Sequence, residues 1–562
     1  MNLYISFILK KIITGHLCIF FILFSIIGVL AQDLTLKLTS KNQNESSVLE
    51  KVNYIKKHKD STTLKLEINR VSDYLKTIGY FTNTVLTIEK VNTTYIAHFS
   101  LNAKIETALI RVNSNSEIYL EEFKIIHNTI SIPIKILQTT LHEISKKLDK
   151  QGKSFSKVQL KNISIKNDTL FANLSINQSK KRVINKVVVK GYKNFPRSYL
   201  KNYFNITAST TFNQQKIEEI AKASKSIQFI STIKPPETLF TKDSTLIYLY
   251  FKRRQSSSFD GIASFTTKED GRVLFNGNMD LKLNNILNKG ELFELFWNRI
   301  GEERQELKLT STAPYIFNSK FSPEVSFSIY KQDSSFTNTT FHSKVSYSIQ
   351  PKTQLAISYN RESSQNLKKS NIQPIETFDN YFLGLYFKYS IAKNDFFFNE
   401  RFFLEINPSF GKRKSNQNHL NQFKIETTTS YLWDINFRNS IYIKNKTAHL
   451  NSSYFLNNEL YRIGGANSIR GFNEQSIFSS SYSYFNLEYR FLTSEKSYFY
   501  TITDIANIKT ATGKENLLGI GLGYLFTTKN AQINVNSALG RSSSKGFDFD
   551  QTKLSINWIS FF

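Results

Sequence analysis

Residues 481–491 read Ser-Tyr-Ser-Tyr-Phe-Asn-Leu-Glu-Tyr-Arg-Phe, and their alternation decides the fold of the C-terminal half. Successive side chains of an extended strand point to opposite faces. One face carries the apolar row Phe485, Leu487, Tyr489 and Phe491. The opposite face carries the more polar row Tyr484, Asn486, Glu488 and Arg490. Lipid accepts the first row and a wet lumen suits the second, which predicts a strand of a membrane-spanning β-barrel.

The same pattern fills residues 257–562, where apolar and polar side chains alternate in segments of about ten residues. Turns rich in Asn, Ser, Lys and Gly separate these segments, and helical periodicity disappears. The count is about sixteen strands, roughly eleven before the long region Asn451–Phe478 and about five after it. A soluble β-sandwich also alternates, but it rarely needs so many strands of this length. The sequence therefore predicts an antiparallel transmembrane β-barrel.

Two further strands favour a barrel. In one of them, Gly519, Gly521 and Gly523 form the row opposite the apolar row, and such a row leaves room inside the wall for something bulky. The last strand also alternates, and the chain stops on an aromatic residue. This ending resembles the C-terminal signal by which outer-membrane barrels are recognised for insertion, a role that we assign to Trp558 and Phe562.

One motif is specific enough to suggest a site. Residues 462–472, in the long region between two strands, read Arg-Ile-Gly-Gly-Ala-Asn-Ser-Ile-Arg-Gly-Phe. The glycines around Arg470 allow the backbone to turn tightly and send the guanidinium inward. Inside a barrel an unpaired, desolvated charge is costly, so Arg470 needs acidic partners. Glu488 points to the lumen on the next strand, and Asp504 is a candidate on the strand after it.

Residues 32–254 have a different character, because helical and strand-like patterns alternate there in three cycles of about 70 to 75 residues. Each cycle runs strand, helices, strand, strand, and can bury a modest two-layer core. The helix faces of the first two cycles are Ile68, Val71, Leu75 and Ile78, and Leu137, Leu141, Ile144 and Leu148. The cycles predict three small modules, at residues 32–103, 104–181 and 182–254. An unrelated series of α+β domains is the alternative.

Two segments give these cycles a family resemblance. Gly79-Tyr80-Phe81 follows the helix of the first cycle, and residues 184–191, Ile-Asn-Lys-Val-Val-Val-Lys-Gly, open the third. The three cycles thereby resemble POTRA domains, the periplasmic modules of outer-membrane assembly proteins. The loop segment closely resembles the conserved-loop motif of the BamA/TamA and two-partner-secretion superfamily, Val-Arg-Gly-Phe or Tyr. Here the motif is Ile469-Arg470-Gly471-Phe472, preceded by Gly464 and Gly465.

The resemblance carries expectations for the site. In that superfamily the motif lies on the loop between the eleventh and twelfth barrel strands, which is where the strand count places it here. The family arginine reaches back into the lumen to acidic residues on the following strands. This implies the same role for Arg470, with Glu488 and Asp504 as its partners. The resemblance covers essentially the whole chain after residue 31, and its layout is most similar to TamA, which has three modules.

The N-terminus has the layout of a secretory signal peptide. Lys10 and Lys11 precede the almost wholly apolar run Ile12–Leu30, and Ala31 offers a small residue for cleavage. We expect a signal peptide over residues 1–31, with an uncleaved anchor helix as the competing interpretation. The single cysteine, Cys18, lies within this run, so the mature chain is expected to have no disulfide and no thiol chemistry.

Charge and composition narrow the class of protein. The formal net charge is +28. By count, residues 32–254 hold about 37 Lys plus Arg and about 18 Asp plus Glu, which leaves roughly +19 on the modules. A basic surface can attract nucleic acid, anionic lipid or acidic clients, or simply keep the protein soluble. The lysines are scattered and no nucleic-acid-binding motif appears, so we expect no nucleic-acid partner.

Motifs that would carry catalysis are missing from the sequence. The eight histidines are scattered, with no pair at metal-ligand spacing. Thr512-Gly513-Lys514-Glu515 lacks the first glycine and the Ser or Thr of a phosphate loop. No Gly-x-Ser-x-Gly segment marks a nucleophile. We therefore expect no enzyme, no cofactor and no metal.

The resemblance implies an outer-membrane protein of a Gram-negative bacterium, with its modules in the periplasm, that helps client polypeptides enter or cross the membrane. Its implied partners are unfolded outer-membrane or secreted polypeptides, outer-membrane lipid and lipopolysaccharide, with an inner-membrane or periplasmic partner left open. The seam between the first strand, near Phe259 to Phe265, and the last, near Lys553 to Phe562, would be a lateral opening. Weak pairing there would let a client strand add to an exposed edge.

Two alternative functions remain open. A two-partner-secretion transporter for one large exoprotein usually has two modules, an N-terminal plug helix and a Pro-rich linker. Residues 32–60 show no such helix and no proline, which argues against it. A passive porin or surface antigen is the second alternative, and the modules and the Arg470 motif argue against that one.

Overall fold

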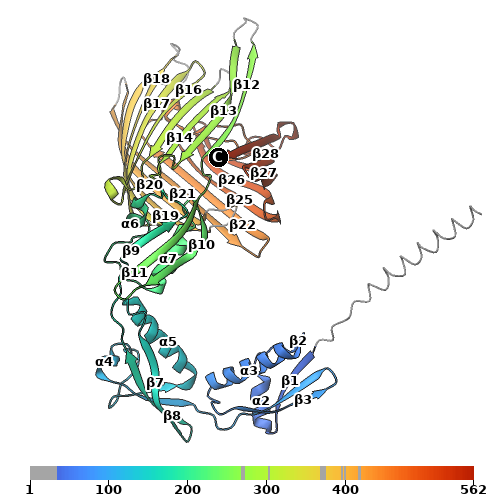
Figure 1. The fold of residues 1–562 in the computed structure, drawn as a ribbon. Coiled ribbons are helices and arrows are strands. Elements are labelled where there is room, and N and C mark those ends of the chain that lie inside the picture. Colours follow the sequence, from blue (N-terminus) through green and yellow to red (C-terminus); the bar gives the residue numbers. More distant parts are fainter. Residues whose placement is uncertain are drawn as a thin grey trace, which may run out of the picture. The chain divides into compact units, whose positions relative to one another are not determined.

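The computed structural model describes residues 34–267, 273–300, 304–367, 375–393, 397, 400–415 and 419–562 (Figure 1). The predicted signal peptide, residues 1–31, lies outside these described residues. The chain divides into two compact units, Met1–Lys181 and Arg182–Phe562. No helix in the described part of the chain is both long enough and apolar enough to cross a membrane.

The first module is a four-stranded sheet covered by two helices. Its strands are β1 (Leu34–Ser40), β2 (Lys57–His58), β3 (Thr84–Val91) and β4 (Thr94–Ser100), in the order β2-β1-β4-β3. Helices α2 (Gln43–Glu50) and α3 (Ser61–Thr77) pack Leu49, Ile68 and Val71 into the core of the module. Asp60 begins α3 by accepting a hydrogen bond from the Thr63 amide at 2.7 Å, which satisfies one of the free amides of the first turn.

Helix α2 lies within residues 32–60, and the sequence analysis did not name it. It is eight residues long, and its single buried residue is Leu49. Two adjacent apolar residues, Val48 and Leu49, give no helical periodicity, so the sequence could not reveal this helix. The helix belongs to the first module, where it packs beside β1.

The second module repeats this plan. Its strands are β5 (Thr107–Arg111), β6 (Thr129–Pro133), β7 (Lys157–Lys166) and β8 (Thr169–Asn177), in the order β6-β5-β8-β7. Its helices are α4 (Ser114–Glu117) and α5 (Ile134–Lys150). Of the predicted face of α5, Leu137, Ile144 and Leu148 are buried and Leu141 is half-buried.

The third module has the three-stranded order β10-β11-β9. Its elements are β9 (Lys186–Lys190), α6 (Arg197–Asn202), α7 (Gln214–Ser224), β10 (Ile230–Phe240) and β11 (Thr245–Arg253). Every module contains one pair of parallel strands, formed by β1 and β4, β5 and β8, or β9 and β11. One long strand, β3, β7 or β10, then pairs antiparallel with a single neighbour at the sheet edge.

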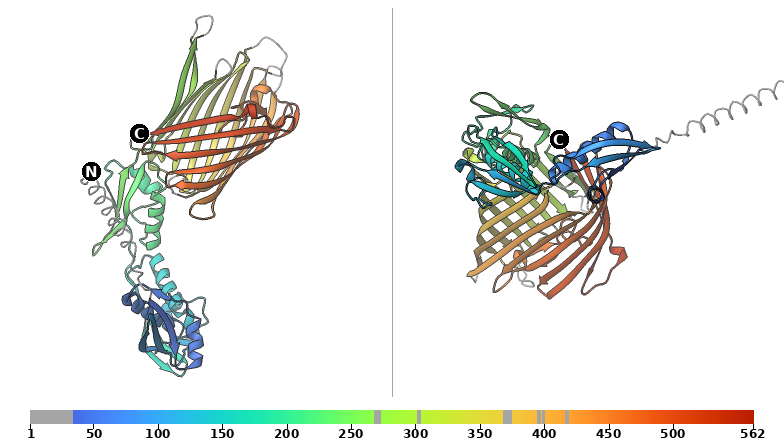
Figure 2. Two further views of the ribbon diagram at one scale, coloured as in Figure 1. Left: turned by 90° about the vertical axis from the view of Figure 1, so that its right-hand side faces the viewer. Right: turned by 90° about the horizontal axis from the view of Figure 1, so that it is seen from below.

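Residues after the third module close into an antiparallel barrel, in which β12 to β22 are followed by β25 to β29 (Figures 1 and 2). The first eleven strands are β12 (Ser258–Thr267), β13 (Val273–Asn284), β14 (Leu292–Ile300), β15 (Arg304–Thr312), β16 (Phe321–Gln332), β17 (Phe336–Gln350), β18 (Thr353–Asn366), β19 (Phe378–Ala392), β20 (Glu400–Ser415), β21 (His419–Asp434) and β22 (Asn439–Asn451). The last five are β25 (Ser481–Ser494), β26 (Ser497–Thr510), β27 (Gly513–Thr527), β28 (Ala531–Ser542) and β29 (Lys553–Phe561). The prediction of a barrel of about sixteen strands, eleven before the long loop and five after it, is confirmed.

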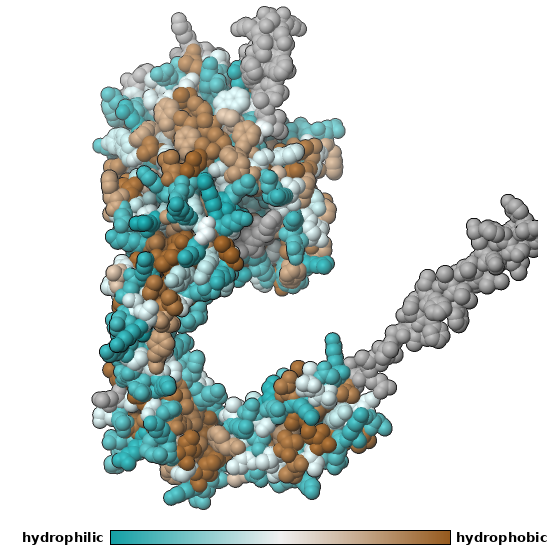
Figure 3. All heavy atoms as spheres, viewed as in Figure 1, coloured by the Kyte–Doolittle hydropathy of each residue, from teal (hydrophilic) through white to brown (hydrophobic). Residues whose placement is uncertain are grey.

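The two faces of the barrel wall differ as the sequence predicted. On β25 the side chains of Phe485 and Leu487 are exposed on the outside, whereas Asn486 and Glu488 are buried on the inside. Apolar side chains gather in patches on the outer wall of the barrel, on the face that Figure 3 shows. An apolar outside around a polar interior is the arrangement of a barrel that spans a membrane.

The third module shares a core with the turns at one end of the barrel. Tyr199 of α6 packs edge-on against Tyr315, in the turn between β15 and β16, with ring centroids 5.1 Å apart. Tyr192 donates a hydrogen bond to Asn288, in the turn between β13 and β14, at 2.7 Å. Burial raises the pKa of Tyr199, so its hydroxyl stays neutral at this junction. We call this the module end of the barrel, and the opposite end, where residues 452–480 join β22 to β25, the loop end.

Candidate functional site: the luminal loop and the barrel seam

The loop of residues 452–480 turns back into the lumen. Strands β23 (Tyr461–Ile463) and β24 (Ile477–Ser479) pair as a short hairpin inside it. At its far end lies the predicted motif, where Gly464 has φ +107°, Gly465 has φ +96° and Gly471 has φ +91°. Only glycine adopts such angles without strain. At Gly471 a Cβ atom would also lie 2.4 Å from the backbone of Leu539, so the loop and the barrel wall meet backbone to backbone.

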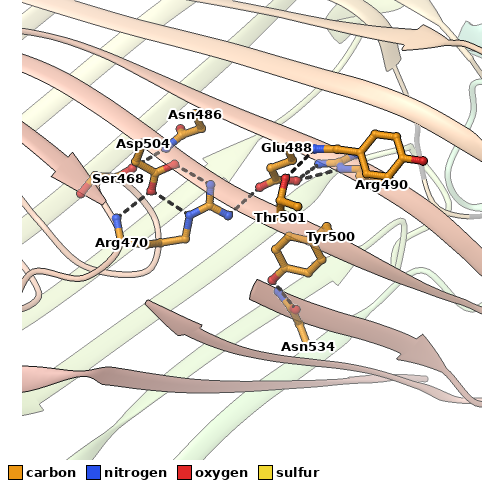
Figure 4. Close-up of polar contacts among 10 residues, drawn as sticks. Ser468, Arg470, Asn486, Glu488, Arg490, Tyr500, Thr501, Asp504 and Asn534 are labelled. Atoms are coloured by element: carbon orange, nitrogen blue, oxygen red, sulfur yellow. Dashed lines mark hydrogen bonds and ion pairs between the residues drawn. The ribbon is translucent and has the colours of Figure 1, made fainter. Parts of the chain in front are cut away.

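Arg470 lies between two carboxylates on neighbouring strands (Figure 4). Its Nε and Nη2 donate to the two oxygens of Asp504 at 2.8 and 2.6 Å, and its backbone amide donates to the same carboxylate at 2.8 Å. Its Nη1 donates to Glu488 at 2.6 Å. The side chain of Asp504 is fully buried, so the pairing operates away from water. Two parallel N–H bonds from one guanidinium to one carboxylate form the strongest arrangement of such a pair.

A second arginine completes this cluster. Arg490 donates to the other oxygen of Glu488 at 2.8 Å, and its guanidinium lies 4.0 Å from the ring centre of Tyr442. Two arginines therefore face two carboxylates, and the buried charges balance. Sequence reasoning placed Arg490 in the luminal row but did not include it in the site. Its position two residues after Glu488, on the same face of one strand, was the available signal.

The residues beside Arg470 hold the loop against the wall. Ile469 is fully buried in a cluster with Tyr482, Tyr484 and Leu517, and Phe472 packs against this cluster. Gly464 and Gly465 follow β23, and Gln475 comes shortly before β24. The amide of Gln475 donates to the carbonyl of Gly464 at 3.1 Å, which brings the two ends of the motif together.

The glycine row on β27 provides the space for this contact. A Cβ atom at Gly519 would lie 2.2 Å from the carbonyl oxygen of Arg470, and one at Gly523 would lie 2.1 Å from the ring of Tyr500. The sequence predicted that this glycine row leaves space on the inner face of the wall. The backbone of the loop at Arg470 and the ring of Tyr500 occupy that space.

We expect Gly519→Ala to weaken the barrel by about 1–3 kcal/mol, because a methyl group forces the Arg470 backbone away from Asp504. Heat resistance of the folded band in detergent electrophoresis measures this effect. Gly546→Ala is the control, since nothing lies within 4 Å of a Cβ atom at Gly546. Equal heat resistance of the two variants would contradict the role given to Gly519.

The predicted insertion signal lies at the end of β29. The side chains of Trp558 and Phe562 are about half exposed on the outer surface. Both are therefore available to a receptor or to lipid, and their signalling role stays a prediction.

The seam between the first and last strands is short. Strand β12 pairs with β29 at only three positions, Ser258 with Phe561, Phe259 with Ser560, and Asp260 with Ile559. Every other neighbouring pair in the barrel has at least eight such positions, as β28 and β29 do. Within the described strands, residues 261–267 and 553–558 have no partner across the seam. The side chain of Asn557, on β29, donates a hydrogen bond across the seam to Asp260, on β12.

A polar cavity of about 630 Å³ opens in the lumen beside the seam. Its wall carries Asp260, Asn298, Asn536 and Asn557, and the loop closes it with Asn467 and Gln475. Among the described residues no group of His, Cys, Asp or Glu is arranged to hold a metal ion. The site thus consists of a luminal loop that is bonded to the barrel wall, a seam with few strand pairs, and a polar cavity lined by residues of both.

Comparisons with known proteins agree with this architecture. No protein-family model matches the sequence, and no curated protein matches it. Among solved structures, the chain is similar to CdiB from Acinetobacter baumannii, with TM-score 0.52 and 12% identity over 89% of this chain and 97% of that one. It is also similar to CdiB from Escherichia coli, with TM-score 0.51 and 13% identity over 88% of this chain and 96% of that one. BamA from Haemophilus ducreyi lacking POTRA domains 1–3 matches with TM-score 0.45 and 15% identity, over 76% of this chain and 93% of that one.

The similarity to the two CdiB structures extends over nearly their whole length, so it includes modules and barrel together. The protein therefore has the fold of the two CdiB structures, with small α/β modules that resemble POTRA domains ahead of a barrel of sixteen strands. The fold class predicted from the sequence is confirmed.

Proposed function

We propose that the protein is an outer-membrane assembly or translocation factor that helps insert client β-barrel proteins through a laterally opening seam. The observation that carries this proposal is the three-position pairing of β12 with β29. Free backbone N–H and C=O groups on residues 261–267 offer a template on which an incoming strand can form a ladder. Opening the remaining pairs disrupts few hydrogen bonds compared with any other place in the wall.

The modules supply edges that suit a client before it reaches the barrel. Strands β3 and β7 each pair with one neighbour and present exposed apolar side chains, Leu86 and Ile88 on β3 and Ile163 and Ile165 on β7. An extended polypeptide can add to such an edge through main-chain hydrogen bonds, while its side chains meet the apolar positions. In β10, Pro235 and its neighbour Pro236 remove two donors, which makes that edge the poorest template of the three.

In this proposal the protein resides in the outer membrane with its modules, residues 32–103, 104–181 and 182–254, in the periplasm and its barrel at 257–562. The boundary between the compact units, after Lys181, supports the division between the second and third modules. Unfolded outer-membrane or secreted polypeptides are its partners, with outer-membrane lipid and lipopolysaccharide around the barrel. Arg470, Glu488 and Asp504 hold the loop in place, and Trp558 and Phe562 direct the protein's own insertion.

The transporter alternative is weakened by the first module. In two-partner-secretion transporters the plug helix precedes the modules. Here residues 34–58 form β1, α2 and β2 of the first module itself. The porin alternative is weakened by the loop, because side chains from both halves of it are bonded to the barrel wall.

Depletion of the protein, followed by quantitative mass spectrometry of the outer membrane, tests the proposal. We expect many unrelated barrel proteins to decline together, because each needs the same seam. Loss of one large secreted protein, with barrel proteins at normal levels, would establish the transporter instead. Unchanged levels of both, with a steady open conductance of the purified protein, would favour the porin.

A further inference from the structure

The turns at the module end of the barrel share one property. Each turn that joins two barrel strands at this end contains a lysine or an arginine. One of these residues, Lys393, is paired with Asp434 at 2.7 Å. The others are Lys289, Lys320, Lys352, Arg438, Lys496 and Lys529. None of this second group forms an ion pair with another described residue, so their charges remain available to a partner. We call the turns that hold this second group the basic rim.

The connections at the loop end have a different composition. Four of them contain neither lysine nor arginine, namely residues 301–303, 333–335, 416–418 and 511–512. The remaining loop-end connections combine basic residues with acidic ones. Acidic residues also occur in the module-end turns, at Glu291, Asp395 and Glu495, but basic residues outnumber them. The lysine-rich composition of the chain therefore does not by itself explain the positive charge of the module end.

Large apolar side chains accompany the cations in three turns of the basic rim. Leu287 is 69% exposed and lies two positions before Lys289. Phe437 is 87% exposed and directly precedes Arg438. Phe317 is 95% exposed, three positions before the lysine of its own turn. Such exposure to water is unfavourable, whereas an apolar side chain beside a cation suits the boundary between acyl chains and phosphate headgroups.

The backbone around Phe317 is held in a strained conformation. Phe317 has φ +50°, and the nearby Tyr315 and Asn318 each have φ +56°. Aromatic residues rarely adopt such left-handed angles. Tyr315 is buried against Tyr199 of the third module, and Asn202 of the same module donates to the side chain of Asn318 at 3.3 Å. The third module therefore fixes this turn on both sides of Phe317, whose side chain no described residue covers.

The apolar outer wall of the barrel continues up to this turn. Phe321, four positions after Phe317, begins β16 and packs against Tyr347 of β17, with ring centroids 5.2 Å apart. Both side chains are exposed on the outside of the barrel. Aromatic residues of a membrane barrel gather where the acyl chains meet the headgroups. The turn that contains Phe317 therefore lies at the height of the headgroups on the module side of the membrane.

We infer that the basic rim binds anionic phospholipid in the leaflet on the module side, with Leu287, Phe317 and Phe437 inserted among the acyl chains. The lysines and the arginine of the same turns bind the phosphates, and each cation near an anionic surface adds to the attraction. Because Tyr199 and Asn202 contact the Phe317 turn, the bound lipid also holds the third module against the membrane surface. This role goes beyond the proposed function, and it needs no client.

Electron paramagnetic resonance measures the preference for anionic lipid. The purified full-length protein is reconstituted in phosphatidylcholine liposomes that contain a small amount of spin-labelled phosphatidylglycerol or, separately, of spin-labelled phosphatidylcholine. The fraction of each label that is immobilised at the protein surface gives the relative association constant of the two lipids. We expect the parent protein to favour phosphatidylglycerol several-fold, and we expect high salt to reduce this preference.

Two matched variants locate the preference on the barrel. The rim variant changes three exposed lysines of the basic rim, Lys289→Gln, Lys352→Gln and Lys529→Gln. The control variant changes three exposed lysines at the loop end, Lys331→Gln, Lys514→Gln and Lys545→Gln. Both variants remove the same charge, and the heat-resistant band in detergent electrophoresis checks that each is folded. We expect the rim variant to lose at least about half of the preference and the control to keep it.

A second measurement follows the insertion of the Phe317 turn. In a Cys18→Ser background, which contains no other cysteine, a nitroxide label is attached at Phe317→Cys. The control label is attached at Gly546→Cys, since nothing lies within 4 Å of a Cβ atom at Gly546. We expect the label at position 317 to collide more often with oxygen, which enters the acyl region, than with a water-soluble nickel complex. The label at position 546 should show the reverse.

An unchanged lipid preference in the rim variant overturns the inference, as does an equal loss in the loop-end control. A label at position 317 that is as accessible to the nickel complex as the control label also overturns it. If the label at position 317 is immobilised only when an unfolded client polypeptide is added, the rim binds client and not lipid. The lipid measurements contain no client, so their failure and the failure of the proposed assembly function give separate results.

Discussion

Arg470→Ala is expected to destabilise the barrel by about 3–5 kcal/mol while leaving export of the chain intact, because it leaves Asp504 buried without a counter-charge and Glu488 with Arg490 alone. Asp504 loses three hydrogen bonds at once, two from the guanidinium and one from an amide that shifts with the loop. The folded band in detergent electrophoresis should unfold at a markedly lower temperature, and client assembly should fall with it.

Two further variants separate charge from geometry. Arg470→Lys keeps the charge but cannot bind one carboxylate through two parallel bonds, so we expect it to recover only part of the stability. Arg438→Ala, in an exposed turn at the module end, is the matched control and should behave as the parent protein does. Normal heat resistance and normal assembly in Arg470→Ala would show that the loop does not depend on this arginine.

Closing the seam with a disulfide is expected to abolish most client assembly. Ser258 and Phe561 lie directly opposite each other on β12 and β29, so Ser258→Cys with Phe561→Cys places two thiols in register. The sequence contains only Cys18, within the predicted signal peptide, so no native thiol in the barrel interferes. A cystine would join the two strands covalently, and a client strand could no longer enter between them.

Assembly of a client barrel into liposomes that contain the purified variant measures this effect. Activity should be lost in the oxidised protein and return when a reductant opens the bond, and each single cysteine variant should remain active throughout. An oxidised double variant with full activity would mean that clients use another route, and the lateral opening would have to be abandoned.

Much of this architecture follows from local patterns in the sequence. Alternation in residues 481–491 fixed which side chains of β25 face the lumen, and the same rule placed Glu488 within reach of the loop. The glycines of the motif indicated a tight turn around Arg470. These features depend on spacing along one strand or one turn, which a single sequence displays directly.

The remaining features depend on contacts between distant residues. Arg413 of β20 and Glu459 of the luminal loop form a buried ion pair, although they are 46 positions apart and lie in segments with no shared pattern. The brevity of the seam is a matter of register between the first and last strands, which are nearly 300 positions apart. Helix α2 has a single buried residue, so tertiary packing rather than periodicity determines it.

The shared core of the third module and the barrel determines where the protein can be divided for biochemical work. Tyr199 is buried against Tyr315, and Tyr192 is bonded to Asn288, so a soluble fragment that ends near residue 254 would carry an uncovered aromatic face. Such a face favours self-association in solution. The compact unit that ends at Lys181 does not include this junction, which makes it the better reagent for capturing clients. In a series of truncations that removes the modules one at a time, we therefore expect residues 182–562 to be the smallest fragment that still folds in the membrane.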